Sequence, residues 1–343
     1  MSYVYDHGSG TAGDPYQVWT ANDLDGVRDH TDAYFIQMAE IDLYGWDWVP
    51  IGHDANWSGS YDGNNFKISN LTTRVGPDES IPIVVTEWDN VGLFGRWYVS
   101  EVRWIKNVNI ENAYIDNTRT KGAGILIGRH SGYTRIKNCK VEGTFVTTGS
   151  VATPWRTGGL IGSKYTAEGY IADCFANINF TGRNISVGGL IGREEDDVGS
   201  EIKRCYSIGS ISETSESYAT VGGLVGWLDN YNTSISNCYS RCDIESISEY
   251  TGGLVGWAEH PVANCYSTGY INSVASAGGL IGHTESTVTN SYYDTETSGK
   301  SDDDGRGTPK TTAEMIYPYS DPDNVYIDWD FHTVWAHDKG GSA

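Results

Sequence analysis

Seven side chains suited to molecular contact recur at one position of a repeated glycine motif. The motif is GGL[IV]G or a close variant, and it occurs seven times between Gly92 and Gly282. The residues that follow its copies are, in chain order, Arg96, Arg129, Ser163, Arg193, Trp227, Trp257 and His283. Arginine and tryptophan readily stack on and hydrogen-bond to ligands. We expect this set, the contact column, to bind a glycan or a partner. The competing interpretation is that its members cover a turn and its tryptophans pack on their neighbours.

Cysteines form a second column, in a motif that begins as IKNC or a variant. Its members are Cys139, Cys174, Cys205, Cys238 and Cys265, with Val108 and Ser291 at the ends and Cys242 four residues after Cys238. Such cysteines could ligate a metal or form disulfides. No Cys-x-x-Cys pair exists, and replacement by valine and serine suits packing better than ligation. We therefore expect all six to be buried, free structural thiols and predict no metal site.

Acidic residues raise two further kinds of chemistry. Glu194–Asp197 and Asp302–Asp304 could hold Ca²⁺, but neither cluster has the spaced D-x-[DN]-x-[DN]-G pattern, so we expect solvated loops and no cofactor. Glycoside cleavage needs two carboxylates at a set separation, which stacked coils could bring together. However, the outward acids of the repeats are scattered, and no Ser-His-Asp or metal-type arrangement is visible. The sequence predicts a non-enzymatic protein, with polysaccharide cleavage as the alternative.

The residues of the contact column and the cysteine column lie in sequence repeats, which we expect to form the coils that position them. The closing glycines of the motif, from Gly95 to Gly282, recur 26 to 34 residues apart. Self-similarity at such a period is typical of a solenoid. The spacing predicts about seven coils, in which glycines allow close backbone approach or a positive φ and the Leu and Ile or Val fill the core.

The cysteine motif predicts a bend in each coil. It begins at Ile105, Ile136, Ile171, Ile202, Ile235, Val262 and Val288. Its Ile and Cys are three residues apart and would face opposite ways on a straight strand. A left-handed bend at the intervening Asn, which tolerates that conformation, turns both inward. Period-two alternation then continues, for example at Cys205, Ser207, Gly209 and Ile211.

Composition excludes several classes of protein. The chain has 343 residues and a formal net charge of −22. That charge disfavours binding to nucleic acid or anionic membranes. No apolar run is long enough to insert in a membrane, and the first residues lack the basic and apolar regions of a secretory signal.

The two ends depart from the repeat and are expected to cap the solenoid. Residues 1–90 contain a short helix that starts after Thr20 and an insertion loop over residues 74–90, and residues 291–343 contain a second short helix at KTTAEM. Residues 91–290 carry the repeats.

Several segments also carry a resemblance. GTAGDPYQV, GSYDGNNFKISNL, the GGL[IV]G motifs with NCYS, SYYDTETSG and WDFHTVW, in this order, resemble the GLUG-motif repeat proteins of bacteria, archaea and their viruses. The resemblance covers nearly the whole chain. It implies an all-β, right-handed parallel β-helix within large surface or adhesion-type proteins, and it carries over no catalytic residues.

These observations lead to an expected function. We expect a non-enzymatic surface-recognition or exterior structural protein, foremost a virion component such as a tail-fibre, receptor-binding or capsid-decorating protein. A virion would carry a chain without a visible signal out of the cell. The alternatives are a cell-surface adhesin and a tailspike-type polysaccharide depolymerase. Expected partners are other virion or surface-assembly proteins, a host-surface glycan or protein, or a second copy of the chain.

Overall fold

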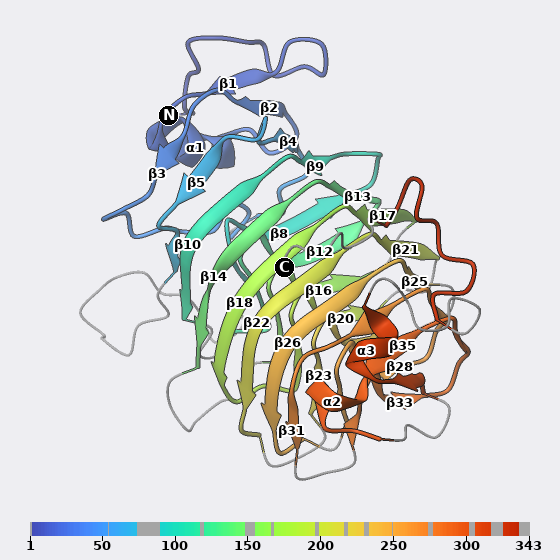
Figure 1. Cartoon of the computed structure of the whole chain (residues 1–343). Coiled ribbons are helices and arrows are strands. Elements are labelled where there is room, and N and C mark those ends of the chain that lie inside the picture. Colours follow the sequence, from blue (N-terminus) through green and yellow to red (C-terminus); the bar gives the residue numbers. More distant parts are fainter. Residues whose placement is uncertain are drawn as a thin grey trace.

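The computed structural model describes residues 2–53, 55–73, 90–116, 120–147, 155–165, 168–195, 199–215, 219–229, 233–248, 250–273, 277–301, 306–316 and 325–335. The chain winds into a parallel β-solenoid whose strands stack along one axis (Figure 1). The strand pairs of its four sheets are parallel, so the predicted all-β solenoid is confirmed. Each complete coil contributes at least one strand to each sheet.

Two long sheets extend from the first strands of the chain to its last coils. The ten-stranded sheet contains β1 (Tyr16–Val18), β2 (Tyr34–Gln37), β4 (Ser60–Asp62), β9 (Ile105–Lys106), β13 (Thr134–Lys137), β17 (Gly169–Ala172), β21 (Ser200–Lys203), β25 (Ser234–Ser236), β29 (Val262–Ala263) and β34 (Val288–Thr289). The twelve-stranded sheet contains β3 (Ile41–Asp42), β5 (Lys67–Ser69), β6 (Thr72–Thr73), β10 (Asn109–Asp116), β14 (Lys140–Val146), β18 (Phe175–Gly182), β22 (Tyr206–Glu213), β26 (Tyr239–Ser246), β30 (Tyr266–Ser267), β31 (Ile271–Ser273), β35 (Tyr292–Asp294) and β36 (Thr308–Lys310).

The glycine motifs build two seven-stranded sheets, in agreement with the seven coils predicted. The first contains β7 (Asn90–Val91), β11 (Gly122–Gly124), β15 (Arg156–Gly158), β19 (Ser186–Gly188), β23 (Thr220–Gly222), β27 (Tyr250–Gly252) and β32 (Ala277–Gly278). The second contains β8 (Phe94–Val99), β12 (Ile127–Gly132), β16 (Ile161–Tyr165), β20 (Ile191–Glu195), β24 (Val225–Asp229), β28 (Val255–Ala258) and β33 (Ile281–Thr284).

The predicted left-handed bend occurs at every copy of the cysteine motif. The seven bend residues have φ between 46° and 57°: Asn107, Asn138, Asp173, Arg204, Asn237, Asn264 and Asn290. The bend turns the preceding Ile and the following Cys into the core, where Ile171 and Cys174 are both fully buried. Asparagine is favoured here because its short polar side chain tolerates the left-handed region.

The glycine motif contains a tight bend between two short strands. Leu190 and Ile191 are both fully buried because the chain turns between β19 and β20, which interrupts strict alternation. The closing Gly192 sits against backbone: a Cβ there would lie 2.5 Å from the Gly162 carbonyl oxygen and 2.7 Å from the Thr157 nitrogen. Close approach, rather than positive φ, therefore requires glycine at this position.

The N-terminal segment contributes to the solenoid and does not only cap it. β1, β2 and β4 continue the ten-stranded sheet, and β3 and β5 continue the twelve-stranded one. The expected helix is α1 (Ala21–Gly26), followed by the 3-10 turn η1 (Val27–Asp29). The Thr20 hydroxyl caps α1 by accepting from the Asp23 N–H. Of the expected insertion loop, residues 74–89 lie outside the described part of the chain.

The C-terminal segment covers both an edge and a side of the solenoid. β36 pairs with β35, and α2 (Thr295–Ser298) and α3 (Thr312–Met315) lie beside them, with α3 at the predicted KTTAEM position (Figure 1). Residues 325–335 turn back along the twelve-stranded sheet. There the ring of Trp335 lies 5.8 Å from that of Tyr266, and its Nε1 donates to Asn237 Oδ1 at 3.3 Å.

Candidate contact face

The contact column is a continuous row on the sheet of β8, β12, β16, β20, β24, β28 and β33. Each member pairs in register with the next, from Arg96 opposite Arg129 to Trp257 opposite His283. Ser163 is buried and the other members are partly exposed. The alignment expected from the sequence is present, while ligand binding by these residues stays a prediction.

Arg193 is the most heavily engaged member. Its guanidinium carbon lies 3.8 Å from the centre of the Trp227 ring, within cation–π range. Its Nε is 2.7 Å from Glu195 Oε1, and a terminal nitrogen pairs with Asp229 Oδ2. The arginine charge is therefore balanced by two carboxylates of its own sheet.

The aromatic members stack along the solenoid axis. The rings of Trp227 and Trp257 are 5.1 Å apart with an interplanar angle of 19°. His283 packs edge-on against Trp257 at 4.6 Å, and Tyr250 packs against Trp257 at 4.5 Å. Since Trp227 has Arg193 on one face and Trp257 on the other, its ring presents an edge outward. The tryptophans do pack on their neighbours, as the competing interpretation expected.

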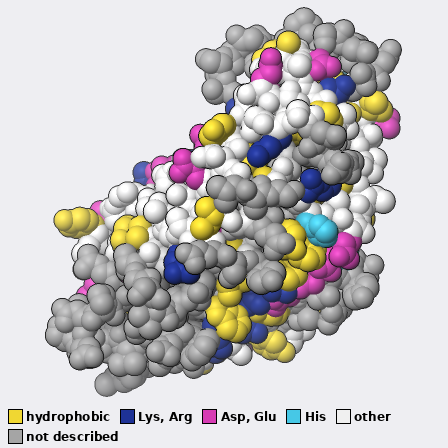
Figure 2. All heavy atoms as spheres, turned by 90° about the horizontal axis from the view of Figure 1, so that it is seen from below, with side chains coloured by type: hydrophobic (Ala, Val, Ile, Leu, Met, Phe, Trp, Pro, Cys, Tyr) yellow, Lys and Arg dark blue, Asp and Glu magenta, His cyan; other side chains and the backbone are white. Residues whose placement is uncertain are grey.

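A second outward column lies two residues further along each strand. Its members are Tyr98, Ser131, Tyr165, Glu195 and Asp229, with Glu259 and Glu285 at equivalent positions of the last coils. Arg129 lies 4.2 Å over the Tyr165 ring, and Trp227 Nε1 donates to Glu259 at 3.3 Å. Figure 2 shows hydrophobic, basic and acidic side chains side by side in one band of the surface. We call the outer side of β16, β20, β24, β28 and β33 the contact face.

A polar row that the sequence reasoning missed lies directly behind this face. Residues between the two outward columns point inward, and they include His130, Lys164 and Glu194, all fully buried. Lys164 Nζ is 2.7 Å from Glu194 Oε1. The assignment of Glu194 to a solvated acidic loop was therefore wrong, because alternation along β20 places it in the core. Alternation counted from the glycine motif could have found this row.

The other members of the two acidic clusters fall largely outside the described residues, which exclude 196–198 and 302–305. Within the described part of the chain, no group of three or more His, Cys, Asp or Glu side chains is placed to hold a metal ion.

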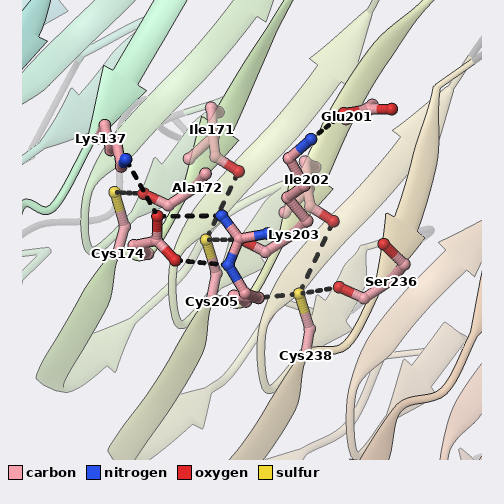
Figure 3. Close-up of polar contacts among 12 residues, drawn as sticks. Lys137, Ile171, Ala172, Cys174, Glu201, Ile202, Lys203, Cys205, Ser236 and Cys238 are labelled. Atoms are coloured by element: carbon pink, nitrogen blue, oxygen red, sulfur yellow. Dashed lines mark hydrogen bonds and ion pairs between the residues drawn. The ribbon is translucent and has the colours of Figure 1, made fainter. Parts of the chain in front are cut away.

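The six cysteines are free and buried, as expected. They do more than fill space: Cys238 Sγ donates to the Ser236 carbonyl at 3.2 Å and accepts from the Cys205 N–H at 3.4 Å. Figure 3 shows the sulfurs of Cys174, Cys205 and Cys238 on successive coils. Ser291 takes the same role by accepting from the Cys265 N–H at 3.1 Å. Burial raises the pKa of the Cys205 and Cys238 thiols well above its ordinary value, so both stay protonated.

The fold and its repeats define the chain as a parallel β-solenoid repeat protein. The model of the GLUG motif matches residues 217–244, which confirms the resemblance to GLUG-motif repeat proteins seen in the sequence. A protein of Evansella cellulosilytica named "putative Gly-rich membrane protein" is 29% identical over 98% of this chain and 45% of its own length. Halomucin of Haloquadratum walsbyi is 36% identical over 30% of this chain and 1% of its own length. The chain thus spans less than half of either relative.

Solved structures share the fold. A crystal structure from Bacteroides ovatus named "putative immunoglobulin A1 protease" has a TM-score of 0.59 and 22% identity, with 90% of this chain and 87% of that chain covered. A structure named "IgA1 Protease" has a TM-score of 0.52 and 17% identity over 85% of this chain and 21% of that chain. At these identities the likeness shows the solenoid fold alone. Among the described residues there is no helix of the length and apolarity needed to cross a bilayer.

Proposed function

We propose that the chain is a non-enzymatic surface-recognition module of an exterior β-solenoid protein and that its contact face binds a partner protein. The observation that carries this proposal is the unbroken row from Arg193 through Trp227 and Trp257 to His283. Arginine, tryptophan and tyrosine dominate the energetics of protein interfaces. Here they are held in fixed positions by a rigid sheet, so little side-chain entropy is lost on binding.

The orientation of the rings favours a protein over a glycan at this face. Sugars stack on an open ring face, and both faces of Trp227 are occupied by Arg193 and Trp257. The face also mixes charges, with Glu195 and Asp229 beside Arg193 and the exposed Glu285 near His283. Such a mixed, aromatic-rich surface suits a protein of complementary charge.

The relatives support an exterior setting. One is named a membrane protein and the other halomucin, and this chain matches only part of each. The coarser proposal is a module of a large surface protein. More specifically, we propose from the sequence that this surface protein is a virion component rather than a cell-surface adhesin. Immunogold electron microscopy of producing cells and of released particles tests it: label on particles supports the virion, and label on the cell envelope alone overturns it.

The contact face is tested with a matched pair of variants. Trp227→Ala/Trp257→Ala removes the stacked rings of this face, whereas Phe175→Ala/Tyr206→Ala removes a similar pair, 4.5 Å apart, from the twelve-stranded sheet. Binding of labelled protein to intact bacterial and archaeal cells is measured by flow cytometry, before and after protease treatment of the cells. We expect protease-sensitive binding that only the first variant weakens, about tenfold or more. Equal binding by both variants contradicts the proposal. Binding that resists protease and is lost after glycosidase treatment identifies a glycan instead and overturns the protein partner.

The name shared by the structural neighbours makes enzymatic activity a direct alternative. The purified chain is incubated with immunoglobulin A1 and, separately, with capsular polysaccharide. Cleavage fragments are sought by electrophoresis and new reducing ends by a colorimetric assay. The proposal expects neither product, and turnover of either substrate overturns it.

A further inference from the structure

A groove lies at the N-terminal end of the twelve-stranded sheet. The strands β3, β5 and β10 run side by side in this region (Figure 1). The volume of the groove is about 490 Å³, within the range of small-ligand sites. It is lined by the turn after β3, by the chain after β5 and by β10, and the side chains that decide its chemistry are Tyr44, Trp46, Asp47, Asn70, Asn112 and Tyr114. None belongs to the contact face or to the repeated motifs.

The polar wall of the groove contains the amides of Asn70 and Asn112, which continue a hydrogen-bonded row that begins at Asp42. Asn70 and Asn112 both have left-handed φ, at 60° and 54°, and the register of β10 shifts between Ile110 and Ala113. Asn112 Nδ2 donates to Asn70 Oδ1 at 2.5 Å, and Asn70 Nδ2 donates to Asp42 Oδ1 at 2.7 Å. Since each amide nitrogen carries two hydrogens, each has a second donor for a ligand.

Asp42 anchors this row as a carboxylate. Hydrogen bonds from the Asn70 amide and from the Tyr44 backbone N–H lower the pKa of Asp42 below its ordinary value. The two asparagine amides are therefore held in place by hydrogen bonds, and their remaining N–H groups can donate to ligand oxygens.

The aromatic wall is exposed. Tyr44 is 82% exposed and Tyr114 is 41% exposed, while Trp46 packs partly against the core. Gly45, with φ of 81° and no atom within 4 Å of a Cβ position, makes the turn that carries Tyr44 outward. Unlike Trp227, these tyrosines retain ring area for a ligand.

We propose that this groove binds a neutral saccharide. Open aromatic rings can pack on the C–H faces of a sugar, and the Asn70 and Asn112 amides can pair with its hydroxyls. Among the lining residues that the structure describes, the charged group is Asp47 and there is no cation. Repulsion by Asp47 and Asp42 disfavours uronic acids, sialic acids and phosphorylated ligands.

The test uses cellotriose, mannotriose, maltotriose and triacetylchitotriose as neutral probes and trigalacturonate as an anionic one. Binding is measured by saturation-transfer NMR and by titration calorimetry on the whole chain. Tyr44→Ala and Tyr114→Ala remove ring area. Asn112→Gly removes an amide and keeps a residue that accepts the left-handed φ. Tyr270→Ala, which removes another exposed tyrosine, is the matched control.

At least one neutral probe is expected to bind saturably, and each groove variant to weaken it about tenfold or more, while Tyr270→Ala leaves it unchanged. Trp227→Ala/Trp257→Ala should also leave it unchanged, which separates this site from the contact face. Lack of binding by every neutral probe overturns the proposal. So does preference for trigalacturonate, or equal weakening by Tyr270→Ala.

Discussion

Lys164 and Glu194 face each other on adjacent coils inside the solenoid, with Nζ 2.7 Å from Oε1 and both side chains fully buried. Register pairing of β16 with β20 places them opposite each other. Ser200 hydrogen-bonds to both, at 3.2 Å to Lys164 and 3.1 Å to Glu194, and also to Thr233. The contact face outside thus rests on a buried, hydrogen-bonded ion pair.

Removing one charge of this pair should lower the free energy of unfolding more than removing both charges together. Lys164→Met leaves Glu194 buried without its counter-charge, and we expect a loss of about 3–5 kcal/mol in the free energy of unfolding. Lys164→Met/Glu194→Leu removes both charges and should lie much closer to wild type. Urea unfolding followed by circular dichroism measures both. A double variant as unstable as the single one would show that the pair itself stabilises the fold.

His130 makes stability depend on pH. Burial, reinforced by the Lys164 charge, lowers the pKa of His130 to about 3, whereas an unfolded histidine titrates near 6.5. Between these values the unfolded chain binds a proton that the folded chain does not, so stability rises with pH. The contribution is complete above about pH 6.5 and is lost as the pH falls toward 3.

The size of this effect can be measured with His130→Gln. At 1.36 kcal/mol per pKa unit, the titration of His130 should cost wild type about 3 kcal/mol between roughly pH 7 and pH 4.5. The variant lacks this cost, so its urea midpoint should fall less over the same range. Identical pH profiles for the two proteins would contradict the buried neutral state of His130.

The conformation and burial of the repeated residues could be predicted, because identical residues at a fixed spacing occupy equivalent positions in successive coils. The bend at Asn107, the burial of Cys205 and the alignment of Trp227 with Trp257 all follow from the column pattern. The side-chain pairings could not be predicted, because they depend on contacts between residues of different columns. The pairing of Arg193 with Glu195 and Asp229, which balances its charge, needs the twist and register of three strands.

The non-repeated parts were less accessible to sequence reasoning. The groove between Tyr44 and Tyr114 joins residues that are far apart in sequence and follow no period. The return of Trp335 onto Tyr266 was likewise missed, because an aromatic run shows that a segment packs but not which surface it covers.

At the cysteine positions, substitution by serine should destabilise the protein less than substitution by valine. Cys238→Val leaves the Cys205 N–H and the Ser236 carbonyl without the partners that Sγ supplies, and an unpaired buried group costs about 1–3 kcal/mol. Cys238→Ser keeps an acceptor and a donor, as Ser291 does in the last coil. Thermal unfolding should rank wild type and Cys238→Ser above Cys238→Val. The reverse order would mean that volume, rather than hydrogen bonding, selects cysteine here.

The closing glycines should not tolerate even a methyl group. In Gly192→Ala the new Cβ would lie 2.5 Å from the Gly162 carbonyl oxygen and 2.7 Å from the Thr157 nitrogen, and neither backbone atom can move without disturbing adjacent coils. Overpacking of this kind costs about 1–3 kcal/mol or more. Gly13→Ala is the matched control, because a Cβ at Gly13 meets no atom within 4 Å. Urea unfolding should place Gly13→Ala within about 0.5 kcal/mol of wild type and Gly192→Ala well below it. If both variants were equally stable, the glycine motif would not be required by close approach between coils.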